Sequence, residues 1–270
     1  KKDNPLPAIC GRICNRRCED ACTRGSIDQA IAIDEVKKFI AQQDLDAETR
    51  YIPKKVVPSL NGSFSEKVAI IGAGPAGLSC AFYLAEKGYS PVIFEKNEKP
   101  GGMLRYGIPS FKLEKDVIDA EIDIIKAMGV EIKCGIEVGK DVTLDELRAQ
   151  GYKAFYIAIG CQGGRKAGIP GEDAEGVMTA VDFLRTVGAD ESYPVTGKAV
   201  VVGGGNVAID VARTAQRCGA ESVAMFCLEP RDKMPASEEE IAEALEEDVT
   251  IDCGWGPKEV HLDEAGRVCG

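Results

Sequence analysis

The chain contains a single histidine, His261, among its 270 residues. A serine–histidine catalytic triad, or a zinc site built from several histidines, is therefore not expected elsewhere in the chain. Although the chain has eleven cysteines, it contains no C-x-x-C or C-x4-C pair. Flavin disulfide reductases pass electrons through such a dithiol, so the sequence argues against that route.

Positive charge and long apolar runs are also scarce. The formal net charge of −11 argues against a nucleic-acid partner, which would need a basic face on the protein. No apolar run approaches the roughly 20 residues of a membrane span, and the sequence shows no signal peptide. Four of the cysteines are clustered rather than spread between loops, which favours a reducing cytoplasm over a secreted, disulfide-bonded protein. We therefore predict a cytoplasmic protein with no membrane contact.

The most informative feature that is present is a nucleotide-binding signature that occurs twice. The copies are VAIIGAGPAGLSCAFYLAEKGYSPVIFEK at residues 68–96 and VVVGGGNVAIDVARTAQRCGAESVAMFCLE at residues 200–229. Each copy predicts a strand, a glycine turn, a helix and a second strand. The two helices are predicted to stop at Gly88 and Gly219, which have the same separation in sequence as the first glycines of the two turns. The sequence therefore predicts an internal repeat of one βαβ unit.

The first copy carries the pattern G-x-G-x-x-G directly after its strand, at Gly72, Gly74 and Gly77. The first glycine allows a tight turn, the second lets the backbone approach a pyrophosphate, and the third packs the helix on the strand. The helix N-terminus then points at the phosphates. Glu95 ends the following strand and is expected to accept a hydrogen bond from a ribose hydroxyl.

The second copy repeats the pattern with Gly203, Gly205 and Ala208, and Glu229 follows its second strand. A carboxylate at that place bonds the ribose 2′-hydroxyl and repels a 2′-phosphate, which favours NAD(H) over NADP(H). Arg231 lies two residues further on and is the kind of side chain that a 2′-phosphate would need. The alternative for Glu229 is a solvated acid at the end of a strand.

Four cysteines with the spacing C-x3-C-x3-C-x3-C precede both copies. They are Cys10, Cys14, Cys18 and Cys22. Thiolates are the usual ligands of iron–sulfur clusters, and the arginines between them lower thiol pKa values and offset cluster charge. Zinc sites more often use C-x2-C spacing, so iron–sulfur is favoured over zinc, and disulfides are the third alternative. Two dinucleotide sites and this cluster suggest an electron relay from a nicotinamide through a flavin to iron–sulfur.

The predicted fold is α/β, with two Rossmann-like dinucleotide-binding domains and a small α-helical N-terminal segment. The predicted divisions are a Cys-rich helical segment, a linker and two domains, at residues 1–40, 41–66, 67–187 and 188–270. Within the first division, Ile33, Val36, Phe39 and Ile40 are predicted to share one face of a helix.

Seven segments resemble one family: CGRICNRRCEDAC, IGAGPAGL, EKNEKPGGMLRYGIPSFKL, YIAIG, IPGED, GGGNVAID and MPASEEE. The family is the small (beta) subunit of glutamate synthase and its relatives, FAD-dependent pyridine-nucleotide oxidoreductases with an N-terminal iron–sulfur domain. The segments occur in the family's order and cover nearly the whole chain. The same module recurs in dihydropyrimidine dehydrogenase and in flavin subunits of bifurcating, hydrogenase and formate dehydrogenase complexes.

The resemblance implies that the first glycine motif holds FAD, that the second holds the nicotinamide nucleotide, and that [4Fe-4S] clusters carry electrons to a partner. The implied FAD-binding residues are Gly72, Gly74, Pro75, Ala76, Gly77, Glu95, Lys96, Gly101, Gly102, Met103, Lys112 and Val138. The implied NAD-binding residues are Gly203, Gly205, Asn206, Val207, Ala208, Glu229 and Arg231. The implied iron–sulfur ligands are Cys10, Cys14, Cys18 and Cys22.

The chain departs from the family in three ways. NADPH-using members carry an arginine pair where this chain has Leu228 and Glu229, which supports NADH. The family has further cysteines upstream, and the position of an acid or amide ligand used by some relatives is matched here by Lys37, which leaves the number of clusters open. The family also closes its FAD domain with a later Gly-Asp segment, so both domains are expected to be incomplete at Gly270.

The favoured hypothesis is an FAD- and iron–sulfur-containing oxidoreductase subunit that moves hydride between NAD(H) and FAD and passes electrons to a redox partner subunit or ferredoxin. No residue needs to act as a general base, which agrees with the scarcity of histidine. The resemblance implies a hetero-oligomeric complex. One alternative is an NADPH-dependent glutamate synthase small subunit. Another, of a different class, is a non-catalytic scaffold that binds dinucleotide and zinc.

Overall fold

Two parallel sheets carry the two glycine repeats, and each sheet belongs to its own compact unit of the chain. The computed structural model describes residues 1–56 and 63–270. The first unit comprises residues 1–105 and 110–161, and the second comprises residues 106–109 and 162–270.

The division between the two units lies after Cys161, earlier than the boundary between residues 187 and 188 that the motifs predicted. The reason is helix α8 (Ala180–Ala189), which packs on α9 (Asn206–Arg217) of the second repeat. Phe183 and Leu184 of α8 are buried in the same hydrophobic cluster as Ile209 of α9. A helix that supplies core residues to the second sheet belongs to the unit of that sheet.

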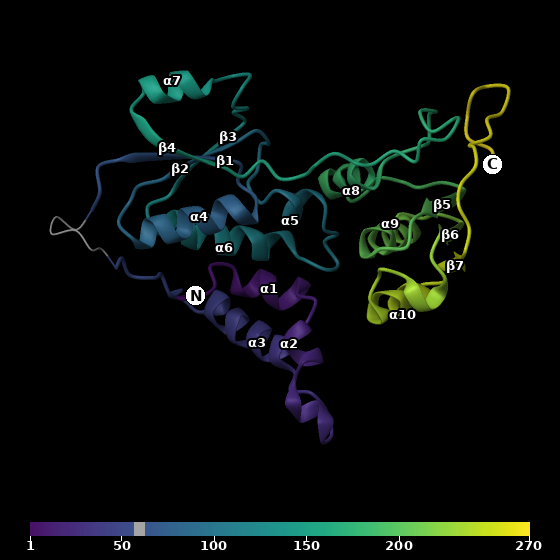
Figure 1. Ribbon diagram of the computed structural model, residues 1–270, viewed down its shortest axis with the longest axis horizontal. Coiled ribbons are helices and arrows are strands. Elements are labelled where there is room, and N and C mark those ends of the chain that lie inside the picture. The colour runs from purple at the N-terminus through teal and green to yellow at the C-terminus, as the bar shows by residue number, and fades with distance from the viewer. Residues whose placement is uncertain (57–62) are drawn as a thin grey trace. The chain divides into compact units, whose positions relative to one another are not determined.

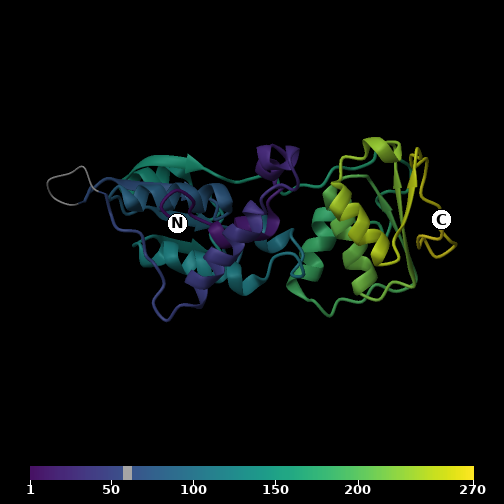
Figure 2. The ribbon, with the colours of Figure 1, turned by 90° about the horizontal axis from the view of Figure 1, so that it is seen from below.

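The N-terminal segment is helical, as predicted. Its elements are α1 (Pro7–Ile13), α2 (Arg17–Asp20), the 3-10 helix η1 (Thr23–Ser26) and α3 (Ile33–Asp46). Helix α3 therefore extends into the stretch 41–66 that was predicted as a linker, of which residues 57–62 lie outside the described residues. Helix α1 packs on α3, and both contact α6 of the first unit on its side away from the sheet (Figures 1 and 2).

The predicted helix at α3 is confirmed, but its apolar face does not point into the protein. Val36, Phe39 and Ile40 are exposed, at 52%, 65% and 62% of their surfaces. Helix α3 instead buries the side that faces α1, because Gly11 lets the two backbones approach closely. A Cβ on Gly11 would lie 2.7 Å from the Cα atom of Lys38. Close contact between helix backbones thus outweighs the hydrophobic pattern at this position.

A buried carboxylate joins α1 to the rest of the first unit. Glu121 of α6 (Lys115–Ala127) is 1% exposed and accepts hydrogen bonds from the backbone N–H groups of Ala8 and Ile9, at 3.1 and 3.3 Å. These groups belong to the first turn of α1, where N–H groups have no partner within the helix. Burial raises the pKa of Glu121 from 4.5 to about 7, although the two N–H groups act in the opposite direction.

The first sheet has the strand order β3-β2-β1-β4, with all neighbours parallel. Its strands are β1 (Lys67–Ile71), β2 (Val92–Glu95), β3 (Glu131–Cys134) and β4 (Tyr152–Ile157). Its helices are α4 (Pro75–Glu86), α5 (Met103–Tyr106), α6 and α7 (Leu144–Ala149). Helices α4 and α6 lie on one side of the sheet and α7 lies on the other (Figure 1). The sheet is thus covered on both sides, which explains the apolar run in β1.

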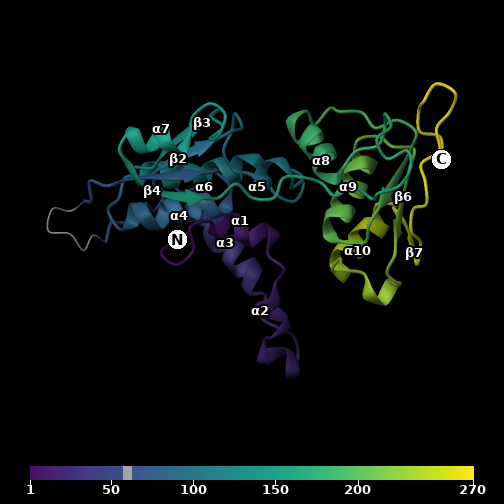
Figure 3. The same cartoon turned by 45° about the horizontal axis from the view of Figure 1, so that its top comes forward.

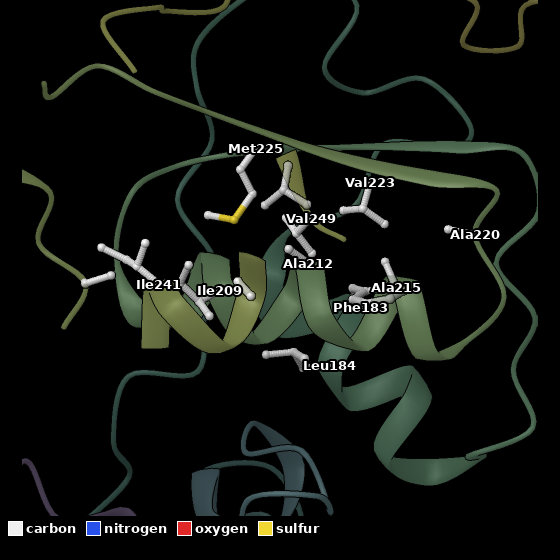
Figure 4. Packing of buried hydrophobic residues seen from close by; sticks show 13 residues of the cluster. Phe183, Leu184, Ile209, Ala212, Ala215, Ala220, Val223, Met225, Ile241 and Val249 are labelled. Carbon is white, nitrogen blue, oxygen red and sulfur yellow. The ribbon is translucent and has the colours of Figure 1, made fainter. Parts of the chain in front are cut away.

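The second sheet has the order β5-β6-β7 and is also parallel. Its strands are β5 (Lys198–Val202), β6 (Ser222–Cys227) and β7 (Thr250–Cys253). The 3-10 helix η2 (Arg231–Lys233) and helix α10 (Glu238–Glu246) connect β6 to β7. Helices α8, α9 and α10 lie together on one side of the strands (Figure 3). Between helices and sheet, Ile209, Met225 and Ile241 are fully buried (Figure 4).

The predicted internal repeat is confirmed in the first strand, the glycine turn and the helix of each copy. Strand β5 has the same length as β1, helix α9 has the same length as α4, and both pairs are separated by the same distance along the sequence. In each repeat the glycine after the first strand donates its N–H to the carbonyl of a phenylalanine on the second, at 2.8 Å in the first repeat and 2.9 Å in the second. Among the described residues, no helix has the length and apolar character needed to cross a membrane.

Glu121 gives the stability of the first unit a specific pH dependence. The folded carboxyl holds its proton up to about pH 7 and the unfolded one only up to about 4.5, so the free energy of unfolding falls as pH rises through this window. The loss is at most about 3 kcal/mol. Glu121→Gln should remove this slope, as measured by urea unfolding between pH 4.5 and 7.5. Asp123→Asn, at an exposed site on the same helix, is the control and should keep it. An equal slope in all three proteins would contradict the prediction.

Candidate dinucleotide sites and cysteine segment

The first glycine loop is a tight backbone crossing at the end of β1. Gly72 has φ 108°, and a Cβ there would collide with the carbonyl oxygen of Ala158 after β4. A Cβ on Gly77 would collide with the carbonyl oxygen of Gly72. Helix α4 therefore starts directly against the tip of β1. Its N-cap, Gly74, has no capping side chain in the described structure, so the N–H groups of the first turn are left for a ligand.

Gly101 and Gly102 form a second layer of backbone on this loop. The N–H of Gly101 donates to the carbonyl of Ala73 at 2.9 Å. Gly102 has φ 54°, and a Cβ on it would lie 2.7 Å from the Cα atom of Gly74. The structure therefore brings the predicted Gly101, Gly102 and half-buried Met103, which begins α5, next to the first loop.

Glu95 accepts hydrogen bonds from other residues of the protein. It is 3% exposed, and its Oε2 accepts the N–H of Ala73 at 2.7 Å. Its Oε1 accepts the backbone N–H and the Nδ2 of Asn97, at 2.9 and 2.6 Å. The carboxylate thus fixes the glycine loop, a role that the motif did not predict. Because a carboxylate has about four acceptor positions, these bonds are compatible with the ribose contact, which stays a prediction.

The remaining residues predicted to bind FAD lie at separate places within the first unit. Pro75 and Ala76 are exposed in the first turn of α4, where a diphosphate would lie. Lys96 is exposed directly after β2. Lys112 is half-buried between α5 and α6, and Val138 is half-buried in an isolated bridge with Val142.

The second loop repeats the first with more open space. Gly203 has φ 141°, and a Cβ on it would touch Ala208 at 3.4 Å. Gly205 is the N-cap of α9, and no described atom lies within 4 Å of the position that its Cβ would take. Asn206 and Val207 are exposed in the first turn of the helix. The predicted residues thus line one open helix N-terminus, the geometry that suits a diphosphate.

The segment before α10 supports the second loop from behind. Ala236 donates its N–H to the carbonyl of Gly204 at 3.0 Å. Ser237 donates its N–H to Oδ1 of Asn206 at 2.9 Å. The amide oxygen of Asn206 is therefore bound within the protein, and its NH2 group keeps the donors that a phosphate needs. The MPASEEE segment contributes to the family resemblance but gives no sign of this contact, so sequence reasoning missed it.

The residues predicted to discriminate between NAD and NADP lie at and after the end of β6. Glu229 is half-buried, and its Oε2 lies 3.3 Å from the position of a Cβ on Gly204, so its carboxylate reaches the loop. Leu228 is 72% exposed. Arg231 forms a two-pronged pair with Glu238, at 3.0 and 2.8 Å. The guanidinium is therefore held by an acid of α10.

The four clustered cysteines follow one another along the N-terminal segment. Cys10 lies in α1, Cys14 is its C-cap, Cys18 lies in α2 and Cys22 is the N-cap of η1. Among the described residues, no three His, Cys, Asp or Glu side chains lie in an arrangement that holds a metal ion. The set of four ligands around one cluster therefore stays a prediction.

The surroundings of these cysteines suit thiolate chemistry. Backbone groups of Ile31, Arg24 and Gly25 lower the pKa of Cys22, which favours the form that binds iron. Burial disfavours the charge of Lys37, but its pKa is raised by Asp34 and by the nearby Cys14 and Cys10. Lys37 pairs with Asp34 at 2.5 Å. Since an ammonium has no lone pair, Lys37 does not replace the acid or amide ligand of some relatives.

Comparison with known families agrees with this geometry. A family model described as pyridine nucleotide-disulphide oxidoreductase matches residues 66–263, which include both glycine loops. The chain belongs to this family. A second model, described as dihydropyrimidine dehydrogenase domain II, 4Fe-4S cluster, matches residues 1–49. The chain is thus a glutamate synthase small subunit-like FAD/NAD(P) oxidoreductase sequence with an N-terminal 4Fe-4S domain, as the resemblance implied.

This chain is similar both to a relative named as NAD-dependent and to a relative named as NADPH-linked. It is 40% identical to the NAD-dependent dihydropyrimidine dehydrogenase subunit PreT of Escherichia coli O157:H7, over 97% of this chain and 62% of that protein. It is 36% identical to the glutamate synthase [NADPH] small chain of Escherichia coli K12, over 99% of this chain and 58% of that protein. The chain therefore spans about three fifths of the length of these two relatives.

A solved structure supports the fold alone. Thioredoxin reductase of Lactococcus lactis aligns with a TM-score of 0.56 and 23% identity, over 76% of this chain and 69% of that one. The α/β fold with Rossmann-like sheets is thereby confirmed.

The crossing of Gly102 over Gly74 can be tested directly. Gly102→Ala adds a Cβ at a positive φ and 2.7 Å from the Gly74 Cα. It should lower the free energy of unfolding by about 1–3 kcal/mol and weaken FAD binding at least about tenfold, as measured by flavin fluorescence. Gly163→Ala, whose Cβ meets no described atom within 4 Å, is the control and should change neither value. Wild-type FAD affinity in Gly102→Ala would contradict the assignment of this crossing to the flavin site.

Proposed function

We propose that this chain is the dinucleotide-binding part of an NADH-dependent oxidoreductase subunit that passes electrons through FAD and iron–sulfur to a redox partner. The observation that carries the proposal is the repeat itself. Two βαβ units, whose first strands and helices match in length, each place a helix N-terminus at a glycine loop, and no described side chain caps either N-terminus. The match of residues 1–49 to a 4Fe-4S domain supports the iron–sulfur part.

The first loop is assigned to FAD and the second to NAD(H). Bound FAD would supply the ring that takes a hydride from the nicotinamide and releases electrons singly. The residues of the protein bind the two nucleotides and orient them. Gly74, Pro75 and Ala76 present backbone and the α4 dipole to the FAD diphosphate, and Gly205 and Asn206 do the same for NADH. No side chain is required to move a proton.

The preference for NADH is supported by the two charges after β6. Glu229 reaches toward the second glycine loop, where a carboxylate bonds a ribose 2′-hydroxyl and repels a 2′-phosphate. Arg231, the cation nearest to it in sequence, is bound by both oxygens of Glu238. The guanidinium that would bind a 2′-phosphate is therefore already paired with the carboxylate of Glu238.

The iron–sulfur ligands are assigned to Cys10, Cys14, Cys18 and Cys22. The partner is assigned as a redox subunit or a ferredoxin within a hetero-oligomeric complex, in the cytoplasm. Support comes from relatives that are named as subunits, including PreT. A second candidate, an NADPH-dependent glutamate synthase small subunit, is favoured by the 36% identity to such a chain.

The test is an assay of the purified, iron-reconstituted chain with a one-electron dye. The expected result is flavin absorbance, bound iron and sulfide, and dye reduction by NADH in preference to NADPH. A strong preference for NADPH would favour the glutamate synthase candidate. Zinc without iron, together with no dye reduction by either nucleotide, would favour a non-catalytic scaffold and overturn the proposal.

The pair of Arg231 and Glu238 predicts how coenzyme preference is altered. Glu238→Gln should release the guanidinium toward a 2′-phosphate and raise kcat/KM for NADPH about three- to tenfold, with NADH changed less than about twofold. Glu246→Gln, an exposed acid on the same helix, is the control for a general charge effect. The double variant Glu238→Gln/Arg231→Ala should lose the gain. A gain that persists without Arg231 would show that the pair does not control the preference.

A further inference from the structure

Two cysteines that lie apart in sequence meet beneath the second glycine loop. Cys227 ends β6, Cys253 ends β7, and the two residues are register partners in the parallel sheet. Their Sγ atoms lie 3.7 Å apart. The Sδ of Met234 lies 3.7 Å from the Sγ of Cys253. The sheet therefore brings two thiols into van der Waals contact.

The backbone geometry permits a bond between the two sulfurs. Neighbouring strands lie about 4.8 Å apart, within the range of about 4.4–6.8 Å between Cα atoms that disulfides span. The Sγ atoms need to approach by about 1.6 Å to reach the bond length of about 2.05 Å. A movement of this size is within reach of side-chain rotation and small shifts at two strand ends.

The pair lies against the residues assigned to the nicotinamide nucleotide. Cys227 is 2% exposed, and a Cβ on Gly204 would lie 2.9 Å from its Cβ and 3.4 Å from its Sγ. The thiol of Cys227 also contacts the carbonyl of Glu229 at 3.5 Å. On the other strand, Gly254 donates its N–H to that same carbonyl at 3.3 Å. A change at either sulfur is thus transmitted to Gly204 and Glu229.

We propose that Cys227 and Cys253 are a redox-active dithiol that a hydroperoxide converts to a disulfide, and that this disulfide weakens dinucleotide binding at the second loop. The effect on binding rests on the function proposed above. The formation of the disulfide does not, because it depends on the two sulfurs alone.

The reaction balances with hydrogen peroxide as the oxidant. The half-buried Cys253 releases its proton and attacks one peroxide oxygen as a thiolate. The O–O bond breaks, the leaving hydroxide takes up a proton, and a sulfenic acid and one water form. Cys227 then attacks the Sγ of Cys253, the S–O bond breaks and a second water leaves. Two thiols and one peroxide give one disulfide and two waters, and two electrons pass from sulfur to oxygen.

The surroundings of the two thiols agree with these roles. Burial and the neighbouring Cys253 raise the pKa of Cys227 to about 11, which disfavours Cys227 as the thiolate that attacks the peroxide. The contribution of Cys253 to this shift ends once Cys253 has become a neutral sulfenic acid, and Cys227 then acts as the second thiol. Cys253 is the more exposed of the two, so it meets the peroxide first.

Disulfide formation moves groups that a nucleotide needs. The Sγ of Cys227 is drawn toward Cys253 and away from Gly204, and Glu229 follows two residues later on the same strand end. We expect the dissociation constant of the second loop for ADP-ribose, a ligand without a redox-active ring, to rise about tenfold. By linkage, ADP-ribose disfavours the disulfide by the same factor. Saturating ADP-ribose should therefore raise the reduction potential of the pair by about 30 mV.

The experiment treats the reduced chain with hydrogen peroxide, blocks free thiols and maps linked peptides by mass spectrometry. ADP-ribose affinity is then measured by calorimetry for the reduced and oxidised forms. We expect a peptide linking Cys227 to Cys253 and an affinity loss that dithiothreitol reverses. Cys227→Ser, Cys253→Ser and Cys253→Ala should abolish both effects, whereas Cys218→Ser, at the C-cap of α9, should keep both.

Failure of this proposal is distinguishable from failure of the proposed function. If no peptide links Cys227 to Cys253, the dithiol is refuted whatever the chain binds. If the link forms but ADP-ribose affinity is unchanged, the coupling to the second loop is refuted. If the reduced chain does not bind ADP-ribose, the assignment of the second loop fails together with the coupling, and the peptide map alone decides on the disulfide.

Discussion

The structure depends on one backbone contact that is made twice, where a helix starts against the tip of the first strand of a βαβ unit. In both repeats the glycine after that strand donates its N–H to the neighbouring strand, at 2.8 and 2.9 Å, and turns with a positive φ. This contact aims a helix N-terminus, with its uncompensated N–H groups, at the carboxyl edge of a parallel sheet. The other contacts in both sites hold the glycine loop in place, and the residues after β6 are predicted to select the coenzyme.

Each loop is held by a different neighbour. In the first repeat the buried carboxylate of Glu95 accepts the N–H of Ala73, and Gly102 crosses over Gly74. In the second repeat the segment before α10 binds Gly204 and Asn206 instead. No described atom lies within 4 Å of the position that a Cβ on Gly205 would take, which suits a nucleotide that exchanges. The first loop is covered by a second layer of backbone, which suits a resident cofactor.

The glycine pattern predicted both loops, both helices and the common offset between the two repeats, because these features are encoded by local backbone geometry. Contacts between distant residues were not predictable. The apolar stripe of α3 is exposed because Gly11 allows contact on the opposite side. The pairing of Arg231 with Glu238 and of Cys227 with Cys253 depends on how α10 and β7 return to the second sheet. The division after Cys161 depends on the packing of α8, which carries no motif.

The central claim is that the second loop holds the diphosphate of NADH while the first holds FAD, and Gly205→Glu tests it most directly. No described atom lies within 4 Å of the Cβ position, so the side chain fits, but its carboxylate would repel a diphosphate at the α9 N-terminus. Equilibrium dialysis should show unchanged FAD binding and at least about a hundredfold weaker NADH binding. NADH binding equal to that of the unaltered chain would contradict the account.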